Sequence, residues 1–171
     1  LNRFIDAARE YELSNIIRIC SDNPFLISYY IADLIENFKE NDYLDYISYK
    51  MSNGLPVIKS HLGLFVEVVS LSALKKAKEE TDNKEYLGNV TQYIYENPDK
   101  FNVLLNDAPD IVFDKFNLRL TVDDYDDFKY LSDLYALLDP DLDNLNKLIR
   151  RIESNEVLMN YMRRNILKYQ K

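Results

Sequence analysis

The chain has 171 residues, 47% of them hydrophobic, which is enough for one domain with a buried core and is unlike the composition of a disordered chain. Its 29 acidic and 21 basic residues leave a formal charge of −8, which disfavours nucleic-acid binding, and its single cysteine excludes disulfide frameworks and multi-cysteine zinc sites. With only three glycines the chain can form neither a P-loop nor a dinucleotide-binding glycine motif, and no apolar run approaches the roughly 18 residues of a membrane span. We therefore expect a cytoplasmic protein without membrane insertion.

Helical and extended patterns alternate along the first half of the chain. In chain order they predict a helix over residues 1–11, a strand over 15–20, a helix over 30–38, a strand over 45–49, extended structure over 55–70 and a helix over 73–80. Gly63 marks a turn or bulge within the extended segment, and either Ser70 or Ser72 can cap the helix that follows it.

The alternation continues in the second half of the chain. The predicted elements are a helix over 86–97, strands over 101–105 and 117–122, and helices over 128–138, over 142–152 and from 155 onward. Strands that alternate with helices predict an α/β fold, with a sheet flanked by helices. The segment DPDLD (139–143) predicts a boundary between a core over residues 1–138 and a C-terminal helical extension over 139–171.

The segment LRLTVDDYDD ends in four carboxylates within five residues, a pattern that suits either the start of a helix or a metal ion. Asp124 is placed to be the N-cap of the next helix, and Asp127 can return a hydrogen bond as a capping box. Asp126, in the first turn, is favoured by the helix dipole. Asp123 has no such structural explanation, so it is the candidate for chemistry.

A second aspartate, Asp22, also follows a predicted strand. Ligands of open α/β sheets bind beyond the carboxyl ends of the strands, where Asp22 and Asp123 are both expected. Alternatively, Ser21 or Asp22 caps the helix that begins near Ser28. As a pair, the two aspartates suit magnesium, which takes one or two protein carboxylates and completes its shell with water and phosphate oxygens. A nucleoside triphosphate would then be the partner ligand.

Five segments in this order resemble one enzyme family: RICSDNP, DYISY, GLFVEVVS, NVTQYIYENPDKF and LRLTVDDYDD. They are similar to the cytidylyltransferases of the spore coat polysaccharide biosynthesis type, which are related to the acylneuraminate and ketodeoxyoctonate cytidylyltransferases. The resemblance covers roughly residues 1–138. It implies a nucleotide-diphosphosugar transferase-like, Rossmann-like mixed sheet, and magnesium-dependent transfer of CMP from CTP to a sugar acid or related sugar. It also implies a homodimer joined by extended β arms, for which residues 56–69 are suited.

The resemblance assigns roles to individual residues. Asp22 and Asp123 match the family's magnesium ligands and, with Arg119, form the expected catalytic set. Three further residues match substrate-binding positions: Arg18, Glu67 and Thr91. The two arginines either face anionic groups or lie at an edge or on the surface, Glu67 is expected to touch the acceptor sugar, and Thr91 is alternatively a helix-surface or capping residue.

The chain departs from the family in its expected acceptor half. Phe65 stands where the family has an aspartate, and Leu87, Gly88 and Asn89 stand where it has Arg-Glu-His. The sugar is therefore unusual, or this half of the site has decayed. The single histidine, His61, is expected to have a packing or surface role.

The family's basic, glycine-containing CTP loop has no counterpart in the chain. The resemblance therefore implies that about the first third of the family's domain is missing, and we expect residues 1–171 alone not to turn over CTP. The alternative is a non-catalytic relative that acts as a binding or assembly domain.

Overall fold

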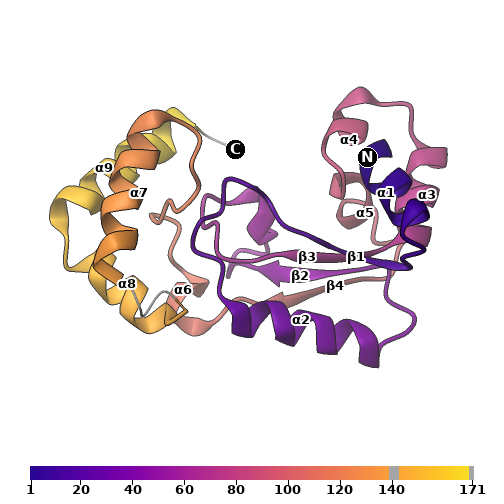
Figure 1. Ribbon diagram of the computed structural model, residues 1–171, viewed down its shortest axis with the longest axis horizontal. Coiled ribbons are helices and arrows are strands. Elements are labelled where there is room, and N and C mark those ends of the chain that lie inside the picture. Colours follow the sequence, from indigo (N-terminus) through magenta and orange to yellow (C-terminus); the bar gives the residue numbers. More distant parts are fainter. Residues whose placement is uncertain (139–142, 170–171) are drawn as a thin grey trace. The chain divides into compact units, whose positions relative to one another are not determined.

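The computed structural model describes residues 1–138 and 143–169 and has the predicted α/β fold (Figure 1). The chain divides into two compact units. The first unit consists of Leu1–Arg18, Asp33–Ser48 and Glu67–Leu105, and the second of Ile19–Ala32, Tyr49–Val66 and Asn106–Lys171. In the part of the chain that is described, no helix is both long and apolar enough to cross a membrane.

Four strands form one sheet in the order β1-β3-β2-β4: β1 (Asn15–Arg18), β2 (Tyr46–Lys50), β3 (Glu67–Ser70) and β4 (Val103–Asp107). Strand β3 lies antiparallel to both of its neighbours, and Arg18 of β1 lies opposite Glu67. Residues of β2 and β3 are almost all buried, whereas β1 and β4 are partly exposed, as expected for edge strands. The strands predicted at 15–20, 45–49 and 101–105 are present, with ends moved by one or two residues.

The first unit packs short helices around one apolar core. These helices are α1 (Asn2–Glu10), α3 (Leu71–Glu80), α4 (Lys84–Gly88) and α5 (Gln92–Tyr95), and α2 (Ser28–Glu40) begins in the second unit and ends in the first. Helix α1 contacts β1 and α3, and α3 contacts β3 and α5 (Figure 1). Ser70, one of the two predicted caps, begins α3 by accepting a hydrogen bond from the Ala73 N–H at 3.0 Å.

The predicted helix over residues 86–97 is wrong as a single element, because α4 ends at Gly88 and α5 begins only at Gln92. Glycine is a poor helix former, so the break falls at a weak point of the pattern. Between the two helices Thr91 is buried, and its hydroxyl donates to Glu67 Oε1 at 2.8 Å. This contact with β3 explains why the chain leaves the helical path here.

The second unit is mainly helical. Its elements are the 3₁₀ helix η1 (Val57–Lys59) and the helices α6 (Asp110–Phe113), α7 (Tyr125–Leu138), α8 (Leu145–Glu153) and α9 (Glu156–Lys168). Helix α8 packs against α6, α7 and α9, and its N-cap Asn144 accepts from the Lys147 N–H at 3.0 Å. Residues 139–142, where the domain boundary was predicted, lie outside the described residues.

Two predictions of extended structure fail in this unit. The segment 55–66 contains η1 and bends instead of a β arm, and β3 begins only at Glu67. Residues 117–122 form no strand, because the backbone beside them is irregular. Single hydrogen bonds hold this segment instead, from Leu120 N–H to the His61 carbonyl at 2.8 Å and from Val122 N–H to the Asp22 carbonyl at 2.9 Å.

Position 63, which the sequence marks as a turn, requires glycine for two reasons, its backbone conformation and the lack of space for a Cβ atom. Its φ is +61°, and a Cβ placed there would lie 2.9 Å from the Leu120 carbonyl oxygen. We therefore expect Gly63→Ala to lower the free energy of unfolding by about 1–3 kcal/mol, as measured by urea denaturation. Gly54→Ala is the matched control for positive φ, because Gly54 (φ +82°) has open space around it. Equal losses in both variants would show that the contact with Leu120 has no effect.

Candidate active site

The acidic cluster begins α7 through a capping box, as predicted. Asp124 Oδ1 accepts from the Asp127 N–H at 2.9 Å, and Asp127 Oδ2 accepts from the Asp124 N–H at 3.3 Å. Asp126 is exposed in the first turn, where the helix dipole favours its charge. Helix initiation therefore accounts for three of the four carboxylates.

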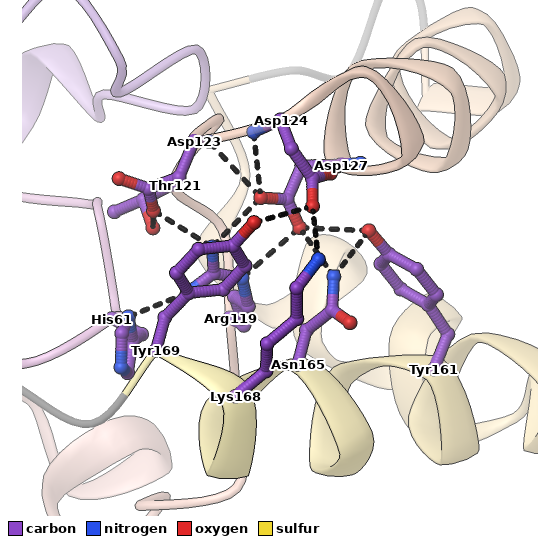
Figure 2. Close-up of polar contacts among 10 residues, drawn as sticks. All are labelled: His61, Arg119, Thr121, Asp123, Asp124, Asp127, Tyr161, Asn165, Lys168 and Tyr169. Carbon is purple, nitrogen blue, oxygen red and sulfur yellow. Dashed lines mark hydrogen bonds and ion pairs between the residues drawn. The ribbon is translucent and has the colours of Figure 1, made fainter.

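Asp127 also forms a buried ion pair that the sequence analysis did not foresee. Both Asp127 and Arg119 are 1% exposed. Arg119 Nε donates to Oδ1 at 3.0 Å and Nη2 to Oδ2 at 2.7 Å, which is the strong two-pronged geometry of an arginine–carboxylate pair (Figure 2). The alternative that Arg119 is an edge or surface residue is therefore wrong.

Burial and pairing have opposite effects on the charges of this ion pair. Burial raises the pKa of Asp127, but hydrogen bonds from Arg119 and from the Asp123 N–H outweigh it, and the net pKa lies well below the ordinary value. Burial lowers the pKa of Arg119, and the contacts with Asp127 and Asp123 more than restore it. Both side chains are therefore charged inside the protein.

Helix α9 covers this ion pair with polar side chains. The Tyr161 hydroxyl and the Asn165 amide donate to Asp127 Oδ1 at 2.8 and 3.2 Å (Figure 2). At the end of the helix, the Tyr169 hydroxyl donates to Asp124 Oδ2 at 2.8 Å. Sequence analysis missed these residues, although their spacing of four places them on one face of a helix.

Asp123 is held by one carboxylate oxygen and by its backbone. Its Oδ2 accepts from Arg119 Nη2 at 2.7 Å and from Thr121 Oγ1 at 3.0 Å, and its N–H donates to Asp127 Oδ2 at 3.0 Å. The side chain is 31% exposed, and among the described residues no hydrogen bond engages Oδ1. Asp123 therefore presents a fixed carboxylate with one oxygen available to a ligand.

Asp22 lies on the backbone segment next to Asp123. Its carbonyl accepts the Val122 N–H at 2.9 Å, so two residues far apart in sequence are on adjacent segments. Asp22 is not the cap of α2, because the Ser28 N–H that begins this helix donates to Asp143 Oδ1 at 2.6 Å. Within the described part of the chain, the Asp22 carboxylate makes no hydrogen bond or ion pair, so helix capping does not account for it.

The donor set suits magnesium better than a metal that needs many protein ligands. The described residues contain no cluster of three or more histidine, cysteine, aspartate or glutamate side chains that could hold a metal. Magnesium needs only one or two carboxylates, because water and phosphate oxygens complete its shell. Arg119 balances one of the charges of Asp123 and Asp127, so with Asp22 the group has a net charge of −2, which a divalent cation would neutralise.

His61 has the predicted packing role and an additional polar contact. The side chain is 8% exposed, and its Nδ1 lies 2.7 Å from Arg119 Nη1. Because a guanidinium can only donate, Nδ1 must accept, which makes His61 the neutral tautomer with its proton on Nε2. His61 therefore helps to satisfy the donors of Arg119.

The three predicted substrate-binding residues lie together in the first unit. Glu67, which is 2% exposed, forms an ion pair with Arg18 and accepts at Oε1 from the Thr91 hydroxyl at 2.8 Å. The Tyr46 hydroxyl, which sequence analysis missed, donates to the same oxygen at 2.5 Å. Burial, followed by the charge of Glu67, raises the pKa of Tyr46 well above its ordinary value. Thr91 is buried, so its surface alternative is wrong; it stands at the N-cap position of α5, but its side chain makes no capping bond there.

Phe65, where the family has an aspartate, is part of an aromatic cluster. It is 6% exposed, and its ring centroid lies 4.7 Å from that of Tyr49 and 5.5 Å from that of Tyr30. Such pairs contribute to stability through apolar burial and ring geometry. This position therefore contributes to the packing of the second unit and provides no carboxylate for binding a substrate.

The chain is similar to proteins of one family in both sequence and structure. The sequence profile of the cytidylyltransferase family matches residues 1–168. A protein of Methanocaldococcus jannaschii without an assigned function is 36% identical over 152 residues, which are 89% of this chain and 57% of that protein. The structure of a cytidylyltransferase from Leptospira borgpetersenii serovar Hardjo-bovis matches with a TM-score of 0.76 at 22% identity, over 92% of this chain and 63% of the other.

The structural match shows a shared fold, and the profile match over nearly the whole chain shows the family. The chain spans less than two thirds of the length of both proteins that it matches. The chain belongs to the cytidylyltransferase family.

Proposed function

We propose that the full-length protein transfers CMP from CTP to a hydroxyl of a sugar acid or related sugar, with release of pyrophosphate. The observation that carries the proposal is the pair Asp22 and Asp123, two carboxylates on adjacent backbone segments. Among the described residues Asp22 has no side-chain partner, and Asp123 is held through a single carboxylate oxygen. Membership of the cytidylyltransferase family supplies the nucleotide class. A CMP-sugar of this kind would serve surface polysaccharide biosynthesis, as the resemblance to the spore coat type implies.

We further propose that Asp22 and Asp123 hold the magnesium ion. When bound, the ion would polarise the α-phosphate and neutralise charge on the departing pyrophosphate. Attack by a sugar hydroxyl needs no protein nucleophile, so the chain contributes by positioning its ligands and substrates and by stabilising charge. Arg119 is buried against Asp123 and Asp127, so we assign it to positioning instead of to direct contact with substrate.

The group around Glu67 is proposed to bind substrate through Arg18. The Arg18 side chain is 20% exposed, whereas Glu67 is enclosed by Tyr46, Thr91 and Arg18 itself. Thr91 would then hold Glu67, and Glu67 would hold the guanidinium of Arg18, whose partly exposed side chain would face an anionic group of the substrate. A cytoplasmic homodimer remains part of the proposal, without the β arms that the sequence suggested.

Magnesium-dependent binding of CTP by the full-length protein tests this function. Isothermal titration calorimetry is expected to detect CTP binding in the presence of magnesium and to lose it when EDTA is added. Residues 1–171 alone are expected to release no pyrophosphate from CTP, because they contain no glycine-rich phosphate loop. Absence of a calorimetric signal from folded full-length protein would favour the alternative, a non-catalytic binding or assembly domain, which the aromatic packing of Phe65 also favours.

A further inference from the structure

Helix α9 is connected to Asp123 through buried polar contacts. Tyr161 and Asn165, one helical turn apart on α9, both donate to Asp127 Oδ1, and Asn165 also donates to the Tyr161 hydroxyl at 2.6 Å (Figure 2). The Tyr161 ring stacks on Tyr130 of α7, with the ring centroids 4.1 Å apart. The hydroxyl and the amide therefore reach Asp127 from a fixed position.

Asp127 in turn constrains Asp123 through two sets of hydrogen bonds. Its Oδ2 accepts the backbone N–H of Asp123 at 3.0 Å, which places the main chain of that residue. The same oxygen accepts from Arg119 Nη2 at 2.7 Å, and this nitrogen also donates to Asp123 Oδ2 at 2.7 Å. One arginine nitrogen is therefore shared between the two carboxylates, so a movement of Asp127 must change the place of the Asp123 side chain.

The residue that follows α9 also restricts Arg119. The ring of Tyr169, the residue that follows α9, lies with its centroid 4.8 Å from the Arg119 Cζ. His61 Nδ1 accepts from Nη1, and Asp127 accepts from Nε, so each of the three guanidinium nitrogens has a partner. With a partner at every nitrogen the guanidinium is held in one orientation, in which Nη2 donates to both carboxylates.

We infer that α9 is a positioning element for Asp123, with Tyr161 and Asn165 as its positioning residues. They hold Asp127, Asp127 holds Arg119 and the Asp123 N–H, and Asp123 then presents its Oδ1 to the cation while Oδ2 is retained by the protein. The inference rests on the proposed magnesium site. It assigns to the C-terminal helix a part in the affinity for the cation, although none of its residues contacts the ion.

Two variants on α9 test this role in the full-length protein. Tyr161→Phe keeps the stacked ring and removes only the hydroxyl, and Asn165→Ala removes the amide. The double variant is expected to raise the magnesium concentration for half-maximal CTP binding by up to about 10-fold. This is the lower end of the about 10–100-fold effect of direct outer-shell partners, because Tyr161 and Asn165 act on the ligand through Asp127. Without any metal, NMR is expected to show faster exchange of the Arg119 Nε–H with water in this variant than in the wild type.

Asn160→Ala is the matched control, because Asn160 is an exposed residue of the same helix. It is expected to leave both measurements unchanged. An unchanged magnesium dependence in the double variant would overturn the inference even if the protein became less stable, because a packing helix alone predicts that result. A wild-type protein that binds CTP without magnesium would overturn the proposed metal site itself, and the role of α9 in it.

Discussion

Asp123→Asn is expected to reduce CTP turnover by the full-length protein by at least about 100-fold, because a direct ligand should contribute more than the outer-shell partners that are worth about 10–100-fold. The amide keeps the size of the side chain and loses its negative charge. Arg119 would retain its two-pronged pair with Asp127, so the fold around the residue should persist. The measurement is pyrophosphate release at saturating magnesium.

Asp126→Asn is the control for this prediction, because it removes the same charge from an exposed position three residues along the chain. Its turnover is expected to stay within about twofold of the wild type, since exposed charges have small effects. Circular dichroism of both variants would check that they are folded. Full activity in Asp123→Asn would show that this aspartate is not a metal ligand.

Asp127→Asn is expected to have the largest effect on stability, a loss of about 3–5 kcal/mol in the free energy of unfolding, because it leaves Arg119 buried with too few acceptors. The asparagine would also place its NH2 group opposite a donor in either orientation, the Tyr161 hydroxyl at the Oδ1 position or the Asp123 N–H at the Oδ2 position. Since the free energy of unfolding of a domain is only about 5–15 kcal/mol, the variant should lose much of its stability. Urea denaturation followed by circular dichroism measures the change.

The same exposed control separates the effect of losing a charge on stability from the effect of losing a buried ion pair. Asp126→Asn and Asp127→Asn remove one carboxylate each from the first turn of α7, so both weaken the interaction with the helix dipole by a similar amount. The exposed substitution is expected to change the free energy of unfolding by no more than about 0.5 kcal/mol. Equal stability of the two variants would mean that the buried ion pair with Arg119 contributes nothing to the fold.

The sequence was sufficient where structure depends on neighbours along the chain. The capping box of Asp124 and Asp127 follows from a spacing of three residues, and a serine cap before α3 follows from the helix after it, with Ser70 and Ser72 as the two candidates. Asp123 was identified as the candidate for chemistry because helix initiation explains the other three carboxylates. Each of these inferences used interactions within one turn of a helix.

The sequence was insufficient where a distant segment determines the local conformation. The helix predicted over 86–97 breaks because Thr91 bonds to Glu67, and the strand predicted over 117–122 has no strand beside it. The hydroxyl that covers Asp127 comes from Tyr161 of α9, a helix that begins at Glu156, about thirty residues later. Periodicity contains no information about such partners.

The hydrogen bond between Val122 and Asp22 has a consequence for folding. It closes a long loop of the chain, and ordering such a loop has an entropic cost that only the completed tertiary structure offsets. The contacts of Asp127 with Tyr161 and Asn165 are similarly non-local, so we expect them to form only once α7 and α9 have packed together. A partly folded chain would not yet hold Asp22, Asp123 and Asp127 in their native arrangement, so the proposed cation site would form only when folding is complete.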